Sequence, residues 1–245
     1  MRLDRIDRVV LTVADPSRSR DALTRLGITM PPAGSSFAVG DASSAAREGN
    51  VVAVELVQGN DPSHVVAFRM DDLEPARGMF GADYEETDGT LRPRNTTAAG
   101  CGVLLLERPP ACEATPHELP LKRVDHLALI PPDYEAGTRY WTDVLGVPVH
   151  AELESPTFWI RQMKVGDVMV ELLRPKPGGP MADAAPGMIP VVACEVDDLA
   201  ACIEDARSRG FEVPDLATGP LPGTVRATVD ATQLGGLSLQ LLQYV

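Results

Sequence analysis

The feature that most constrains the fold of this chain is an internal duplication. The stretch "RIDRVVLTVADPSRSRDALTRLG" (5–27) aligns with "RVDHLALIPPDYEAGTRYWTDVLG" (123–146). Further along, "VVAVELVQ" (51–58) matches "VMVELLRP" (168–175), and "VVAFRMDDLEPA" (65–76) matches "VVACEVDDLAAC" (191–202). Each opening segment reads as a strand, a turn with Pro and Asp, an amphipathic helix and a closing Gly. The sequence therefore predicts two related halves.

Each half itself divides into two modules of a strand, a helix and about three strands. Asp71 and Asp197, or the Asp beside each, are expected to cap the second helix of each half. In the C-terminal half we expect Ala200, Ile203 and Ala206 to form an apolar stripe on that helix, and Gly210 to end it. The predicted domains are 1–110 and 123–245, joined by a Pro-rich linker at 111–122.

Composition narrows the classes of partner. The chain has 245 residues, 44% of them hydrophobic, with a net charge of −13 and a pI near 4.7. This charge argues against nucleic acid and anionic membrane, because both need basic patches. No apolar run is as long as a membrane span, which needs about 18 residues. The N-terminus also lacks the pattern of a signal peptide, so we expect a cytoplasmic protein. The four cysteines form no Cys-x-x-Cys pair and are expected to be structural.

The order and spacing of these segments resemble the vicinal oxygen chelate superfamily. "DHLALIPPDYEAGTRYWTDVLGVPV", then "VELLRP", then "VACEVDDLAACIEDARSRGF" carry the resemblance most strongly. The group includes glyoxalase I, methylmalonyl-CoA epimerase, extradiol dioxygenases and bleomycin-resistance proteins. The resemblance implies an α+β fold, in which tandem βαβββ modules pair into two curved, half-open mixed β-sheet barrels with helices outside.

The resemblance also implies a site inside the C-terminal sheet. Family metal ligands fall on His126, Glu171, Val191 and Gln240, and Val191 cannot bind a metal. His126, Glu171 and Gln240 are thus the expected metal and catalytic residues, with one divalent ion (Mn, Co, Ni, Mg or Zn) or none.

Strand alternation agrees with this placement. Side chains alternate between the two faces of a strand, so His126 opposes Leu127 and Leu129. By the same alternation, Glu171 opposes Val170 and Leu172, and Gln240 opposes Leu239 and Leu241. Each polar residue therefore lies on the face opposite an apolar row, as a lined cavity or a solvated face requires.

The N-terminal half departs from the family pattern. There the four positions fall on Arg8, Glu55, Val65 and Leu104. A guanidinium offers no lone pair for a metal, so this half is expected to be inactive. We expect Arg8 and Glu55 to form an ion pair.

The resemblance implies a lyase or isomerase of glyoxalase or epimerase type that stabilises an enolate or enediolate of a small carbonyl substrate. Glu171 is the first candidate base and His126 the second. A metal-free version uses His126 as the base, Glu171 to orient it and Gln240 to donate to the oxyanion.

Two other functions stay open. One is metal-free binding of a small molecule, as in bleomycin-resistance proteins. The other is an extradiol dioxygenase, whose iron would lack two of its three ligands here. Arg161 and Lys164 are weaker candidates for contact with an anionic substrate. The expected partner is a small molecule, and a homodimer is also open.

Overall fold

A computed structural model describes residues 1–31, 34–40, 51–59, 63–107, 115–179 and 181–245. Its strands form two mixed sheets in this part of the chain, one from each half of the sequence. Cys112 and residues 111–114 of the predicted linker lie outside the described residues.

The first sheet has the strand order β2-β3-β1-β4-β7-β6-β5 among the described residues. Its strands are β1 (Arg5–Val13), β2 (Ser36–Val39), β3 (Val52–Gln58), β4 (Val65–Met70), β5 (Tyr84–Thr87), β6 (Thr90–Pro93) and β7 (Gly102–Glu107). Strands β4 and β7 are parallel, whereas β2–β3, β5–β6 and β6–β7 are antiparallel.

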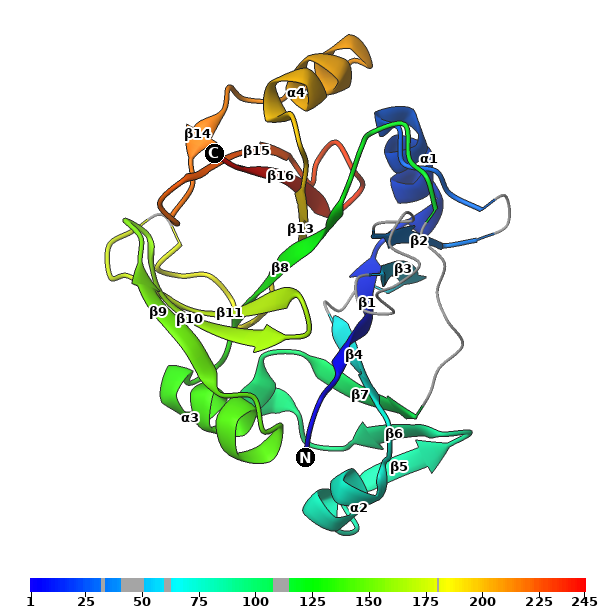
Figure 1. The fold of residues 1–245 in the computed structure, drawn as a ribbon, viewed down its shortest axis with the longest axis vertical. Helices are drawn as coiled ribbons and strands as arrows, with labels where there is room; N and C mark the ends of the chain where they lie inside the picture. Colours follow the sequence, from blue (N-terminus) through cyan, green and yellow to red (C-terminus); the bar gives the residue numbers. More distant parts are fainter. Residues whose placement is uncertain (32–33, 41–50, 60–62, 108–114, 180) are drawn as a thin grey trace. The chain divides into compact units, whose positions relative to one another are not determined.

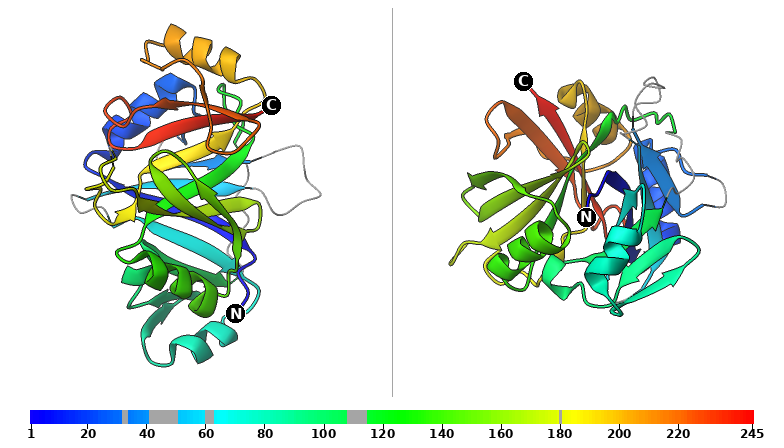
Figure 2. Two further views of the ribbon diagram at one scale, coloured as in Figure 1. Left: turned by 90° about the vertical axis from the view of Figure 1, so that its left-hand side faces the viewer. Right: turned by 60° about the horizontal axis from the view of Figure 1, so that its bottom comes forward.

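The second sheet has the order β14-β15-β16-β13-β8-β11-β10-β9, with β12 paired to β8. Its strands are β8 (Arg123–Ile130), β9 (Val149–Glu154), β10 (Phe158–Val165), β11 (Val168–Pro175), β12 (Gly187–Met188), β13 (Val191–Glu195), β14 (Ala217–Thr218), β15 (Thr224–Val229) and β16 (Ser238–Tyr244). Figure 2 shows β9, β10 and β11 side by side, in keeping with their antiparallel pairing. The modules that begin at β4, β8 and β13 each show the predicted strand, helix and three strands. The predicted α+β fold class is confirmed.

The helices are α1 (Pro16–Leu26), α2 (Glu74–Phe80), α3 (Tyr134–Arg139) and α4 (Leu199–Ser208), with a 3₁₀ turn η1 (Thr97–Ala99) and a π-helical turn η2 (Tyr140–Val144) that continues α3. Three of these helices pack on strands, α1 on β3, α3 on β11 and α4 on β15 and β16 (Figure 1). None of the described helices is long and apolar enough to cross a membrane.

Local sequence sets the ends of these helices. Asp15 caps α1 by accepting from Ser17 N and Arg18 N, and Gly27 ends it with φ at 99°, a left-handed conformation that suits glycine. Asp198 caps α4 by accepting from Ala201 N, as predicted for one of the two aspartates there. The predicted stripe on α4 is partly wrong. Ala200 is exposed, and the buried positions are Leu199, Cys202, Ile203 and Ala206, which follow the i, i+3, i+4, i+7 spacing of one helix face and leave Ala200 outside it.

The chain divides into two compact units. Unit 1 comprises Met1–Val9, Ser63–Ala111 and Leu127–Ile189, and unit 2 comprises Val10–Pro62, Cys112–His126 and Pro190–Val245. Each unit thus combines one module from each sequence half. The predicted domain limits at 110 and 123 follow the sheets and stay a prediction.

The core of unit 1 joins its two modules through aromatic side chains. Phe68 and Trp141 are fully buried and meet edge to face, with ring centroids 5.8 Å apart. Trp141 Nε1 donates to Ala99 O at 3.2 Å. Gly137 allows α3 to approach Pro131, because a Cβ at position 137 would lie 2.6 Å from Pro131 Cβ. The packing depends on residues from both sequence halves.

Unit 2 shows the same kind of joining. Ser19 Oγ on α1 donates to Gly235 O at 3.0 Å, a contact between residues 216 positions apart. The Arg25 guanidinium lies 4.6 Å from the centre of the Phe211 ring. Here too, the first module of the N-terminal half packs on the last module of the chain.

Candidate functional site

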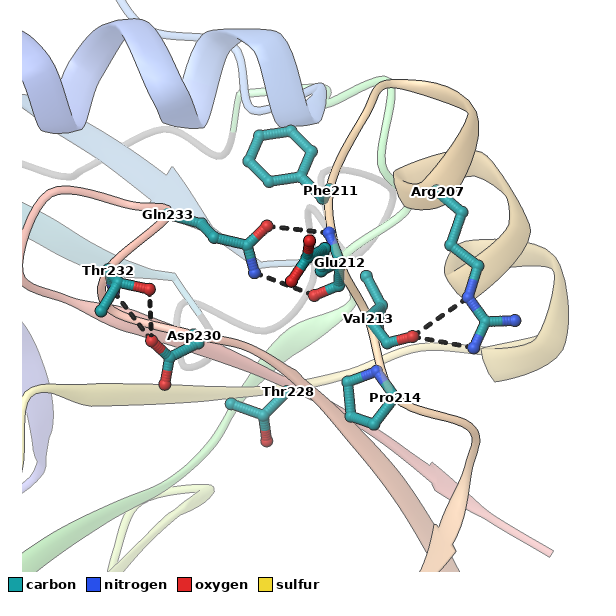
Figure 3. A pocket seen from close by; sticks show the side chains of 9 residues that line it. All are labelled: Arg207, Phe211, Glu212, Val213, Pro214, Thr228, Asp230, Thr232 and Gln233. Atoms are coloured by element: carbon teal, nitrogen blue, oxygen red, sulfur yellow. Dashed lines mark hydrogen bonds between the residues drawn. The ribbon is translucent and has the colours of Figure 1, made fainter.

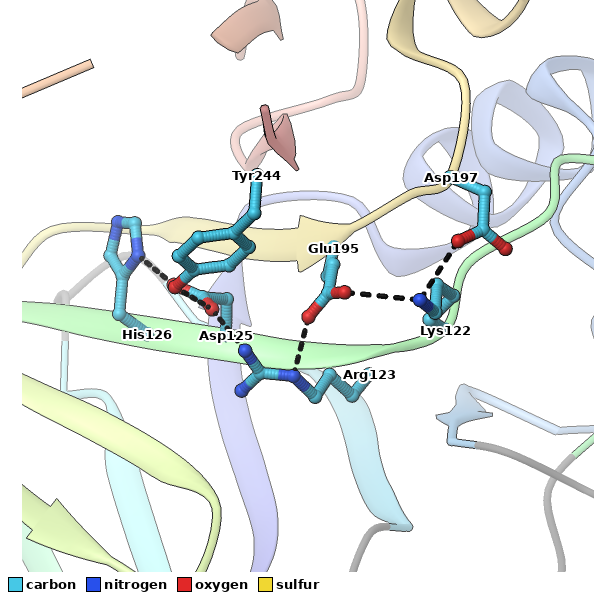
Figure 4. Close-up of polar contacts among 7 residues, drawn as sticks. All are labelled: Lys122, Arg123, Asp125, His126, Glu195, Asp197 and Tyr244. Carbon is cyan, nitrogen blue, oxygen red and sulfur yellow. Dashed lines mark hydrogen bonds and ion pairs between the residues drawn. The ribbon is translucent and has the colours of Figure 1, made fainter. Parts of the chain in front are cut away.

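The predicted residue His126 lies beside a break in the register of β8. Ala193 of β13 pairs with His126, and the next residue, Cys194, pairs with Val124, so Asp125 is an extra residue on β8. Such a bulge changes the direction of side chains that would otherwise alternate between faces. Consequently two consecutive side chains meet, and His126 Nδ1 lies 2.9 Å from Asp125 Oδ1 (Figure 4).

Asp125 is the buried centre of this cluster, with 3% of its surface exposed. Its other oxygen, Oδ2, accepts from Tyr244 OH at 2.9 Å and from an Arg123 terminal nitrogen at 2.8 Å. Burial opposes ionisation of Asp125, but the hydrogen bonds from His126 and Tyr244 and the charges of His126 and Arg123 outweigh it. The pKa of Asp125 therefore lies below its ordinary value.

The ionised carboxylate fixes the state of the histidine ring. An ionised carboxylate accepts hydrogen bonds and donates none, so Nδ1 of His126 must carry the proton in this contact. In the neutral ring Nε2 is then the nitrogen that can accept a proton. This is the arrangement that a histidine base needs, with a carboxylate to stabilise the imidazolium that forms.

A chain of ion pairs runs from this carboxylate toward solvent. Arg123 Nε donates to Glu195 Oε2 at 2.6 Å. Lys122 Nζ donates to the other oxygen of Glu195 at 3.1 Å and to Asp197 at 2.8 Å. Figure 4 shows this sequence of contacts, which holds Arg123 against Asp125 from the far side.

Gln240 lies in the same cross-strand row as His126. Ala193 pairs with His126 on β8 and with Gln240 on β16, and Gln240 pairs with Thr228 on β15. Paired residues share a face of the sheet, so these side chains line one face. The amide of Gln240 donates to Thr228 Oγ1 at 3.5 Å, a long contact that leaves a weakly used donor.

The strand pairing also shows which residues lie near Val191, the family ligand position that cannot bind a metal. Val191 pairs with Ser238, one step along the same face of β13 from Ala193. Neither Val191 nor Ala193 offers a lone pair, and the methyl group of Ala193 is what separates His126 from Gln240. No three His, Cys, Asp or Glu side chains within the described ranges gather as a metal site would require. The donor set does not fit a tightly held divalent ion.

Glu171 lies in unit 1, whereas His126 and Gln240 lie in unit 2. Its Oε1 accepts from Gln162 Nε2 at 2.8 Å, across the β10–β11 pair, and both side chains are buried. Ile160 and Leu173, two residues away on the same face, belong to an apolar cluster with Ile130. The grouping of Glu171 with His126 and Gln240 stays a prediction.

The rows opposite the three predicted residues are fully buried, as strand alternation predicts. They comprise Leu127, Leu129, Val170, Leu172, Leu239 and Leu241.

The N-terminal half keeps the aspartate but not the histidine. Asp7 is 1% exposed, and its Oδ2 lies 3.1 Å from Arg8 Nε. Arg8 belongs to unit 1 and Glu55 to unit 2, so their predicted ion pair stays a prediction. On β3, Glu55 pairs with Ser36 of β2, at the position where Glu171 faces Gln162.

A cavity of about 810 Å³ lies at the other end of the row in unit 2. Thr228 lines it, and so do the polar groups of the loops after α4 and β15 (Figure 3). Those groups largely bond to one another. Gln233 accepts from Glu212 N and donates to Glu212 O, and Arg207 donates to Val213 O. Few of the hydrogen-bond donors that line this cavity are therefore left to contact a ligand.

Asp125, Arg123 and Tyr244 were missed by the sequence reasoning. The available signal was "RID" in one copy and "RVD" in the other, where an aspartate interrupts an apolar strand. A carboxylate buried in that setting needs partners.

The weaker candidate Arg161 pairs with Glu135 at 2.7 Å and Glu152 at 2.8 Å.

Comparison with known proteins agrees with this architecture. The family model of the Glyoxalase/Bleomycin resistance protein/Dioxygenase superfamily matches residues 125–223. A triple mutant of 4-hydroxymandelate synthase from Streptomyces coelicolor is similar in structure, with a TM-score of 0.66 and 15% identity, over 99% of this chain and 93% of that chain. No curated protein sequence matches.

Methylmalonyl-CoA epimerases resemble about half of the chain. The protein from Streptomyces coelicolor gives a TM-score of 0.46 and 19% identity, over 51% of this chain and 99% of that chain. The protein from Mycobacterium tuberculosis gives 0.47 and 19%, over 51% and 89%. Residues 125–223 thus match the model of the Glyoxalase/Bleomycin resistance protein/Dioxygenase superfamily, the group that the sequence resembles.

Proposed function

We propose that this chain is a lyase or isomerase that acts on a small carbonyl compound through an enolate or enediolate. The observation that carries the proposal is the hydrogen bond between His126 Nδ1 and the buried carboxylate of Asp125. That contact leaves Nε2 as the basic nitrogen of a histidine set in a sheet face of a superfamily domain. Gln240, in the same cross-strand row, supplies an amide donor.

In the proposed step, His126 Nε2 takes the proton from the carbon next to the carbonyl group. The electron pair of the broken C–H bond forms the C=C bond of the enolate, and negative charge moves to the carbonyl oxygen. The Gln240 amide donates to that oxygen, and Asp125 stabilises the imidazolium. Return of the proton to the same or another carbon completes an isomerisation.

The orienting role falls to Asp125 in this proposal. Because Asp125 holds Nδ1, Glu171 could orient the ring only through Nε2, the nitrogen that must accept the proton. Glu171 remains a second candidate base. Its Oε1 accepts from Gln162, which holds the carboxylate in a fixed direction.

Proton abstraction is tested by exchange in D₂O. The protein is incubated with a panel of small ketones, 2-oxo acids and acyl thioesters, and loss of the α-proton signal is followed by NMR. We expect at least one class to exchange, with His126→Asn lowering the rate about 10²- to 10⁴-fold. His150→Asn, on the exposed β9 position, serves as the matched control. Equal rates for His126→Asn and the wild type would refute the proposal.

A second candidate is metal-free binding of a small molecule. The apolar residues Ala193 and Val191 favour it, since they stand where a catalytic metal would need a ligand. This function predicts no exchange with any carbonyl class. It also predicts a ligand-induced rise in melting temperature that persists in His126→Ala.

A further inference from the structure

A second cavity, in unit 1, is lined by residues at the carboxyl ends of β8 and β11 and at the start of α3. Its volume is about 420 Å³, within the range of about 300–1,000 Å³ that small-molecule sites occupy. Most of the residues that line it are apolar, Ile130, Leu173 and several prolines and alanines, but polar atoms form slightly more of the cavity surface than apolar atoms do. Tyr134 and Arg174 also line it, whereas His126, Glu171 and Gln240 do not.

Arg174 is held in place by two aromatic rings. Its guanidinium carbon lies 4.3 Å from the centre of the Trp159 ring and 5.1 Å from that of Tyr134. Trp159 faces Arg174 across the β10–β11 pair, so the backbone register itself brings ring and guanidinium together. Cation–π contacts of this kind fix the plane of the guanidinium and leave its N–H edge available.

The neighbouring charges are already compensated. Arg161 pairs with Glu135 and Glu152, and Lys176 Nζ lies 2.5 Å from Glu154 Oε1. Glu135 is close enough for its charge to interact with that of Arg174. Even so, no carboxylate among the described residues forms an ion pair or hydrogen bond with Arg174.

The carboxylates beside the cavity limit the charge of a ligand. Asp133 accepts from Ala136 N at 2.6 Å as the cap of α3, and Glu135 is bound to Arg161. Both remain negative at the rim, so a doubly charged anion is disfavoured. One guanidinium without an ion pair of its own suits one negative charge.

We propose that this cavity binds a small apolar monocarboxylate. The carboxylate accepts two N–H bonds from the edge of Arg174, and the hydrocarbon part packs on Ile130, Leu173 and the prolines. The site is independent of the proposed proton transfer.

Binding is tested directly by isothermal titration calorimetry with benzoate and hexanoate, and by the fluorescence of Trp159. Benzamide and hexanamide, which lack the charge, and inorganic phosphate, which lacks the apolar part, are the comparison ligands. We expect saturable binding of at least one carboxylate, and at least tenfold weaker binding of its amide and of phosphate.

Variants then assign the site. Arg174→Ala should weaken binding of the carboxylate at least tenfold. Arg174→Lys should weaken it several-fold, because an ammonium keeps the charge but loses the planar fork. The matched control is Arg92→Ala, an exposed arginine of β6 in the same unit that lines a different cavity. It should change the affinity less than twofold.

Three results would overturn the proposal. They are the absence of saturable binding for both carboxylates, an Arg174→Ala affinity equal to that of the wild type, and an equal loss in Arg92→Ala. Circular dichroism of each variant shows that the fold is retained. Because binding is read without turnover, the result does not depend on whether the carbonyl substrate exists.

Discussion

The two opening strands of the duplicated halves have kept the same buried carboxylate and given it different neighbours. In β1, Asp7 lies beside Arg8, whose guanidinium is a permanent cation. In β8, Asp125 lies beside His126, whose ring can take up and release a proton. The same aspartate position thus takes part in an ion pair in β1 and supports a possible base in β8. The residue after it decides which of the two functions the strand can serve.

Exchanging the two residues gives the largest expected effect. His126→Arg makes the C-terminal strand resemble the N-terminal one, and α-proton exchange should fall about 10²- to 10⁴-fold, because the base is replaced by a cation. The reciprocal change, Arg8→His, should produce no new exchange, because its row lacks the Gln240 amide. A protein with His126→Arg that exchanges at the wild-type rate would show that the base lies elsewhere.

Removing each carboxylate compares their structural contributions. Asp125→Ala leaves Arg123 and Tyr244 without their buried acceptor, and we expect it to lower the free energy of unfolding by about 3–5 kcal/mol. Asp7→Ala should cost less, about 1–3 kcal/mol, because Asp7 Oδ1 is buried without a hydrogen-bond partner in the described structure. Urea unfolding of both variants measures the difference. Equal losses would show that the two carboxylates are equally supported.

The pH dependence of stability sharpens the same comparison. The pKa of Asp125 is lowered in the folded protein, so the unfolded chain binds this proton at higher pH than the folded one. Its stabilising contribution is complete above the ordinary aspartate pKa of about 3.9 and is lost as pH falls through the lower folded value. Urea unfolding between pH 6 and the acid range, about pH 2, should therefore show a steeper loss for the wild type than for Asp125→Asn. Asp21→Asn, with 76% of its side chain exposed, should keep the wild-type slope.

The smallest expected effect concerns the glutamates that both halves retain. Gln162→Leu deprives the buried Glu171 of its amide donor and should cost about 1–3 kcal/mol in unfolding free energy. Ser36→Ala, opposite Glu55, should change stability by less than about 0.5 kcal/mol. Thermal unfolding of the two variants compares them. A larger loss in Ser36→Ala would mean that the serine, too, supports a buried charge.

The module order could be predicted because periodicity and turn residues repeat in the chain, and the fold class followed from the resemblance to a known superfamily. Sequence reasoning also predicted the buried rows opposite His126, Glu171 and Gln240, since a regular strand alternates strictly. It could not predict the contact between Asp125 and His126, which depends on one extra residue in β8. Alternation alone places these neighbours on opposite faces.

The position of Ala193 shows a second limit of sequence reasoning. The family pattern pointed to Val191 as the lost ligand, but the register places Ala193 between His126 and Gln240. A strand pairing can slide by two residues and keep the same pattern of buried and exposed faces. Only the hydrogen-bonded register distinguishes the two positions.

The composition of the two compact units has a consequence for biosynthesis. The core of unit 1 is complete only when Trp141 packs on Phe68 and bonds to Ala99. Unit 2 likewise needs the contact between Ser19 and Gly235. The N-terminal half therefore leaves the ribosome with apolar side chains exposed, and these side chains are buried only after the C-terminal half has been synthesised. Contacts across such long sequence separations slow folding. We therefore expect chaperones to bind the N-terminal half during synthesis, before the C-terminal half is complete.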